Sequence, residues 1–144
     1  WQWVENPADM RALRDFYRPR YSRFLIMMSE SIDGIVSCRL GEADDAWAVL
    51  RRLLPYLRRP FLLPSESPWN EAMIFHTGLG GLLQLIVHGF AGLRLGHDGT
   101  LSFRPCLPHA IRSITLEGLH HQGRRHRLRV LHNATGCTAD LPPL

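Results

Sequence analysis

The chain has 144 residues, of which 45% are hydrophobic and 21% charged, so it can bury a core as one large domain or two small ones. Its net charge is +4, and every basic side chain is an arginine, which indicates an anionic partner only if the charges cluster. No apolar run approaches the roughly 20 residues of a membrane-spanning helix, so we expect no membrane partner. The chain opens on Trp1 without an initiator methionine, which we interpret as a processed chain or a fragment.

The cysteines bear on the compartment and on metal binding. Cys38, Cys106 and Cys137 lie far apart, and their odd number and spacing fit neither a disulfide framework nor a zinc site. They predict reduced thiols, a cytoplasmic location and no metal site. The sequon at 133–135 favours secretion instead, so the compartment stays open at this point.

Helical periodicity dominates the first two-thirds of the chain. Asn6 and Pro7 predict the start of a helix that should end before Pro19. A second helix is expected over 22–39, with Gly41 as its stop. Its expected buried stripe is Phe24, Leu25, Met28, Ile32, Ile35 and Val36.

Two further helices are expected before the character of the chain changes. The third has acidic residues at its start, from Glu42, and basic residues at its end, to Arg59, an order that complements the helix dipole; Pro55 should kink or shorten it. The fourth spans about 77–91 and carries three glycines in its first turn, which favours close approach of a backbone or a ligand. The expected apolar faces are Trp47, Leu50, Leu53, Leu54 and Leu57, then Leu79, Leu82, Leu83, Ile86 and Phe90.

The last third is predicted to be antiparallel β structure. A turn at 97–99 separates two short apolar runs, and a second turn at Gln122-Gly123 separates two longer ones. In the longer runs charged and apolar residues alternate, so Arg125, Arg127 and Arg129 should share one solvated face. That reading disfavours a nucleic-acid partner, because no aromatic residues interleave with the arginines to stack on bases.

One long stretch, 75–130, resembles a known family. It reads FHTGLGGLLQLIVHGFAGLRLGHDGTLSFRPCLPHAIRSITLEGLHHQGRRHRLRV and is similar to the C-terminal end of glycoside hydrolase family 65. That family includes maltose, trehalose and kojibiose phosphorylases, acid trehalases and glucosylgalactosylhydroxylysine glucosidases. The matching residues are Gly80, Gly81, Gln84, Gly89, Phe90, Gly92, Leu93, Arg94, Asp98, Gly99, Leu101, Phe103, Pro105, Leu107, Pro108, Gly123, Arg127 and Leu128.

The resemblance implies a mixed α-then-β chain. Residues 1–95 would supply the terminal helical hairpins of an (α/α)6 barrel, and residues 96–144 a small antiparallel β cap domain. The general acid of such an enzyme would lie outside this chain. The remainder of the parent chain is therefore an expected partner, and this piece alone is expected to be inactive.

The polar segment SESPWNEAMIFHT, 65–77, holds the candidate site residues. The resemblance places the catalytic base of the hydrolytic members in this loop, so Glu66 is the first candidate and Glu71 the second. Both carboxylates are equally compatible with a solvated loop or a favourable helix-dipole contact. His76 and Thr77 correspond to the position where phosphorolytic members hold phosphate, although the serine of that pattern is missing; alternatively, Thr77 caps the helix.

Trp69 and Asn70 complete the candidate substrate-binding set. The indole of Trp69 could stack on a sugar ring or anchor the loop. We therefore expect the C-terminal fragment of an inverting glycoside hydrolase that cleaves an α-glucoside and needs no cofactor. A sugar phosphorylase, with inorganic phosphate as co-substrate, and a non-catalytic scaffold remain as alternatives.

Overall fold

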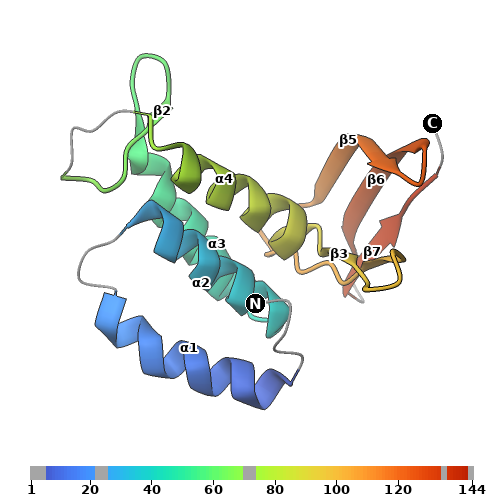
Figure 1. The fold of residues 1–144 in the computed structure, drawn as a ribbon, viewed down its shortest axis with the longest axis horizontal. Helices are drawn as coiled ribbons and strands as arrows, with labels where there is room; N and C mark the ends of the chain where they lie inside the picture. The colour runs from blue at the N-terminus through green and yellow to red at the C-terminus, as the bar shows by residue number, and fades with distance from the viewer. Residues whose placement is uncertain (1–5, 22–25, 70–73, 134–135, 143–144) are drawn as a thin grey trace.

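The computed structural model describes residues 6–21, 26–69, 74–133 and 136–142, and every structural statement below concerns these residues. Helices dominate the first part and strands the last, which confirms the mixed class, although the short pair β1 and β2 comes before the last helix, α4 (Figure 1). The helices are α1 (Pro7–Tyr21), α2 (Met27–Arg39), α3 (Ala43–Leu53), the 3-10 turn η1 (Leu54–Tyr56), α4 (His76–Gln84) and the π-helical η2 (Leu85–Phe90). The strands are β1 (Leu57–Arg58), β2 (Leu63–Pro64), β3 (Leu93–Leu95), β4 (Leu101–Phe103), β5 (Ser113–His121), β6 (Arg124–Asn133) and β7 (Gly136–Asp140).

Helices α2 and α4 run parallel to each other. They pack closely because glycines of α4 leave no side chains between the two helices. A Cβ atom on Gly78 would lie 2.8 Å from Met27 Sδ, and one on Gly81 would lie 2.9 Å from the Ser31 Cβ. Farther along, η2 continues in the same direction beside the second half of α2, where a Cβ atom on Gly89 would lie 3.2 Å from Cys38 Sγ (Figure 1). The predicted close approach at the glycines is thus confirmed at two of the three positions, since a Cβ on Gly80 would meet nothing within 4 Å.

The buried face of α2 differs from the predicted stripe. Met28 is exposed, and the residues that turn inward include Glu30 and Asp33. The predicted stripe contained only apolar residues and left out Met27, which is fully buried. Arginines from α1 and α3 reach the two acids and make their burial tolerable. The expected Phe24 and Leu25 lie outside the described residues.

The other helix boundaries also needed correction. Helix α1 continues through Pro19 to Tyr21, and the Arg20 guanidinium, which stacks on the Phe16 ring and donates to its carbonyl, holds that last turn. Helix α3 ends at Leu53, where Pro55 converts it to a 3-10 turn, as the expected shortening requires. Leu54 and Leu83, placed on the apolar faces, are exposed.

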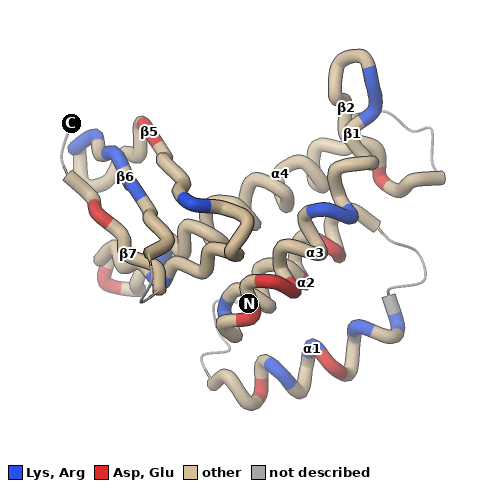
Figure 2. Tube along the Cα trace, turned by 180° about the vertical axis from the view of Figure 1, so that it is seen from behind, with Lys and Arg blue, Asp and Glu red and all other residues tan. Residues whose placement is uncertain are grey.

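Charged contacts attach α1 to the other helices. Glu42, just before α3, accepts hydrogen bonds from Arg11 and Arg14, and Arg18 pairs with buried Asp33 at 2.9 Å. Partial burial alone would raise the pKa of Glu42, but the two arginines hold it below its usual value. Basic and acidic residues accordingly mark α1 and the start of α3 in Figure 2.

The β part consists of two units. β3 and β4 form a hairpin, and β5, β6 and β7 form an antiparallel sheet in that order. Arg125, Arg127 and Arg129 are exposed, while Leu128 and Val130 are fully buried, so the predicted alternation is confirmed. Figure 2 shows the basic residues along β6.

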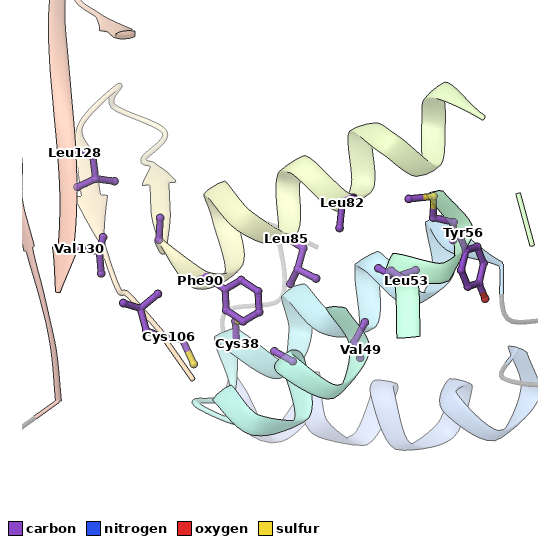
Figure 3. Close-up of a cluster of buried hydrophobic side chains, with 14 residues drawn as sticks. Cys38, Val49, Leu53, Tyr56, Leu82, Leu85, Phe90, Cys106, Leu128 and Val130 are labelled. Carbon is purple, nitrogen blue, oxygen red and sulfur yellow. The ribbon is translucent and has the colours of Figure 1, made fainter. Parts of the chain in front are cut away.

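One core joins the helices to the sheet. Leu85 and Phe90 of the last helical segment lie between Val49 of α3 and the inward face of β6, and Cys38 lies beside Cys106 in the same cluster (Figure 3). Each fully buried side chain of this size contributes roughly 1.5–3 kcal/mol. Burial and a hydrogen bond with Cys106 raise the pKa of Cys38, so this thiol stays protonated. None of the described helices is long and apolar enough to cross a membrane.

Candidate functional site

The segment around Glu66 lies against the first turns of α2 and α4. The Met27 N–H donates to the Glu66 carbonyl at 2.9 Å, and the Phe75 N–H donates to the Pro64 carbonyl at 2.8 Å. Buried Ser65 attaches the segment to Tyr56, because its N–H and its hydroxyl both donate to the Tyr56 carbonyl. These bonds bring Glu66 and the start of α4 to one end of the helical layer, which we call the polar end.

Two helix N-termini therefore meet the polar end. Neither α2 nor α4 has a side-chain hydrogen bond at its N-cap. Of the first-turn amides, the Met27 N–H donates to the Glu66 carbonyl and the His76 N–H donates to the Ile74 carbonyl at 3.1 Å. The positive ends of both helix dipoles face the same region. Such an end stabilises a carboxylate, and it equally attracts a bound anion.

The candidate side chains occupy different positions at this end. Glu66 is half-buried, His76 and Thr77 are exposed at the first two positions of α4, and Trp69 is 81% exposed. The alternative in which Thr77 caps the helix is wrong, because the cap position is Phe75. Asn70 and Glu71 lie outside the described residues, and their roles stay predictions.

The polar end is an open surface within this chain. Cavities of about 740, 460 and 610 Å³ open elsewhere among the described residues, and none of them is lined by Glu66, Trp69 or His76. An exposed indole can stack on a sugar ring, and an imidazole and a carboxylate can form hydrogen bonds with its hydroxyl groups. A closed pocket here requires a second surface opposite the polar end.

Sequence reasoning missed two buried acids on α2. Glu30 and Asp33 are each 3% exposed, and they pair with Arg52 and Arg18, both at 2.9 Å. All four line the 460 Å³ cavity. The signal was available, because Glu30, Asp33 and Ser37 recur at helical spacing among apolar residues and so mark a polar stripe.

Metal binding has no visible basis in this part of the protein. Within the described ranges, no three histidine, cysteine, aspartate or glutamate side chains lie close enough together to hold an ion. The three cysteines are free thiols.

A mixed helical and antiparallel chain with these polar and aromatic residues can be compared with known families through its sequence. Residues 93–143 match the family model described as glycosyl hydrolase family 65, C-terminal domain. The resemblance seen in the sequence is confirmed over these residues, which are similar to the C-terminal domain of glycoside hydrolase family 65.

Named relatives are glycosidases. The chain is 29% identical over 118 residues to a kojibiose hydrolase of Mucilaginibacter mallensis, covering 81% of this chain and 18% of the relative. It is 32% identical over 87 residues to a protein-glucosylgalactosylhydroxylysine glucosidase of Danio rerio, covering 60% and 13%. A cell wall acid trehalase of Arthroderma benhamiae is 31% identical over 119 residues, covering 74% and 11%. The chain thus spans less than a fifth of the length of these relatives.

Proposed function

We propose that this chain is the C-terminal part of an inverting glycoside hydrolase that cleaves an α-glucosidic bond, with Glu66 as the base that activates water. The observation that supports this proposal is the pair of backbone bonds, Met27 N–H to Glu66 and Phe75 N–H to Pro64, that brings the segments of Glu66 and His76 to the polar end. The parallel pair α2 and α4, with α3 antiparallel between them in sequence, supports assigning these helices to the terminal hairpins of an (α/α)6 barrel (Figure 1).

The chemistry assigns each side chain a role. In an inverting hydrolase the base and the general acid lie about 6.5–9.5 Å apart, on opposite faces of the sugar ring. Glu66 deprotonates the attacking water, and the general acid comes from the remainder of the parent chain. Trp69 stacks on the sugar ring. His76, Thr77 and Asn70 form hydrogen bonds with the hydroxyl groups of the sugar. Glu71 is the alternative base.

Exposed apolar residues support a partner surface for the remainder of the parent chain. Leu13, Phe16 and Tyr17 form one exposed side of α1, and Phe61 is 80% exposed near the polar end. Water-exposed aromatic residues gathered on one surface are typical of an interface. The same surfaces would serve a non-catalytic scaffold, which is the outcome if the parent protein lacks activity.

Phosphorolysis is the second candidate, and the N-terminus of α4 at His76, which lacks a side-chain cap, is the observation that favours it. Phosphate would bind the first-turn amides and replace water as the nucleophile. We favour hydrolysis because the acid at position 66 is present and a serine at position 78 or 79 is not.

The natural protein that contains this chain tests the proposal directly. It should release glucose from kojibiose, trehalose, maltose or a glucosyl-galactose in phosphate-free buffer, and the freshly released anomer should be β, as inversion of an α-glucoside requires. Release that depends on inorganic phosphate would replace hydrolysis by phosphorolysis. Absence of both activities on all four sugars would leave the scaffold.

We also propose a cytoplasmic location, because Cys38, Cys106 and Cys137 are all free thiols. Fractionation of the source cells tests this point. Recovery of a glycosylated form modified at Asn133 would place the protein in the secretory route instead.

A further inference from the structure

A strongly basic cavity lies at the opposite end of α2 from Glu66. It has a volume of about 610 Å³ and opens between the start of α1, the end of α2 and the β3–β4 hairpin. Its polar lining consists of Arg39, Arg94, Arg104, His88, His97 and Ser102. No carboxylate is among the described residues that line it.

The hairpin fixes two of these arginines in place. Arg94 lies in β3 directly opposite Ser102 of β4, and the Arg104 N–H donates to the Gly92 carbonyl at 2.9 Å. Gly92 has φ +69°, and a Cβ atom there would lie 2.0 Å from the Arg104 carbonyl oxygen. Only glycine allows this approach. Gly92 therefore lets the backbone of Arg104 lie next to the start of the strand that carries Arg94.

Arg94 lies close to Arg39 and Arg104. The acidic residues that share a cavity with these arginines, Glu42, Asp44 and Asp45, line the neighbouring 740 Å³ cavity and not this one. Burial, with repulsion from Arg39 and Arg104, lowers the pKa of Arg94, yet a guanidinium keeps its charge at any ordinary pH. The Nε atom of Arg94 is buried and has no hydrogen-bond partner in the described structure. None of the ion pairs among the described residues involves Arg94 or Arg104. A cluster of this kind is stabilised when an anion enters it.

His88 adds a further polar group to the wall. Its Nδ1 lies 2.9 Å from the Leu93 carbonyl oxygen. A carbonyl only accepts, so Nδ1 carries the hydrogen and Nε2 is the ring nitrogen left for other partners. The bond also restricts the ring, so the imidazole is held by Leu93, the first residue of β3.

We propose that this cavity binds an oxyanion of the phosphate class, either free phosphate or a phosphate monoester. Guanidinium groups match phosphate oxygens with paired N–H donors, and the Ser102 hydroxyl supplies another donor. The volume falls in the range of roughly 300–1,000 Å³ that small-molecule sites occupy, so an organic group attached to the phosphate can also enter.

The test measures phosphate binding by calorimetry, with the natural protein in buffer free of phosphate and sulfate. Inorganic phosphate and glucose 1-phosphate are titrated separately. Replacement Arg94→Gln or Arg104→Gln should weaken binding of the preferred ligand by about tenfold, because each removes a charge-assisted bond. The control Arg129→Gln, on the exposed face of β6, should leave the affinity unchanged. Tighter binding of the ester than of free phosphate identifies a monoester as the ligand, and equal affinities identify free phosphate.

Arg104 is exposed, so its replacement leaves the core intact and tests the proposal even if the Arg94 variant does not fold. Far-ultraviolet circular dichroism shows whether each variant is folded. Phosphate binding that survives in both variants, or that falls equally in the Arg129 control, would overturn the proposal. So would binding that is lost in His76→Gln but kept in Arg94→Gln, because the phosphate would then lie at the polar end. This test is independent of the proposed glycosidase activity.

Discussion

Replacing Gly81 by alanine should destabilise the protein, whereas the same replacement at Gly80, one residue earlier in α4, should stabilise it. Both glycines are helical, and alanine in a helix interior is favoured over glycine by about 0.5–1 kcal/mol. At Gly80 the new methyl group meets nothing within 4 Å, so the full gain is expected.

At Gly81 the methyl group collides with α2. Its position lies 2.9 Å from the Ser31 Cβ and 3.1 Å from the Ser31 Oγ, which are closer than carbon contacts allow. Ser31 cannot turn aside easily, since its Cβ is fixed by the helix and its hydroxyl donates to the Met27 carbonyl at 2.7 Å. Overpacking costs about 1–3 kcal/mol, which offsets or exceeds the helix gain. The two variants should therefore differ in unfolding free energy by about 1–3 kcal/mol.

Urea unfolding of the natural protein and both variants, followed by circular dichroism, measures this difference from the transition midpoints. The order of midpoints should be Gly80→Ala, then wild type, then Gly81→Ala. Equal stabilisation by the two replacements would refute the close packing of α2 on α4, and with it the placement of the polar end.

Two further predictions concern single contacts. Gly92→Ala should lower the urea midpoint clearly more than Gly99→Ala, because both residues have positive φ but only the first meets a backbone, that of Arg104; equal shifts would contradict the hairpin geometry. Arg52→Gln should destabilise the protein by about 2 kcal/mol, because it leaves the buried carboxylate of Glu30 unpaired; the loss is smaller than the ~3–5 kcal/mol of a fully buried pair since water reaches Arg52. An unchanged midpoint in this variant would mean that Glu30 has another compensating partner.

The β hairpins were predictable because their information is local. Alternating charged and apolar residues determine which face of β6 is wet, and the turn at Gln122-Gly123 has the positive φ values that such a turn requires. β7 was not predicted, because Gly136–Asp140 carries no alternation of its own. Its strand conformation comes from pairing with β6, which no short window of sequence contains.

The inward face of α2 was not predictable from hydropathy alone. Glu30 and Asp33 are buried because Arg52 and Arg18, on other helices, reach them. Met28 is correspondingly displaced to the surface. Periodicity gives the number of helices and their approximate limits, but burial depends on partners that arrive from elsewhere in the chain.

Constellations of distant residues were the hardest to foresee. The resemblance to glycoside hydrolase family 65 indicated Glu66 as a base for hydrolysis and His76 as a contact for phosphate, and backbone bonds bring their segments to one end of the helices. The basic cavity combines the end of α2 with a hairpin far along the chain, so Arg39, Arg94 and Arg104 carry no shared motif. Only the fold brings them together.

Replacement of Glu66 by glutamine tests the central claim most directly. The change keeps the shape of the side chain and leaves the backbone bond from Met27 in place, so it removes only the carboxylate. With the natural protein and its best α-glucoside substrate, kcat should fall by about 10²–10⁴-fold, while Glu117→Gln on exposed β5 should retain full activity. Near-normal turnover in Glu66→Gln would contradict the assignment of the base and remove Glu66 from the catalytic site.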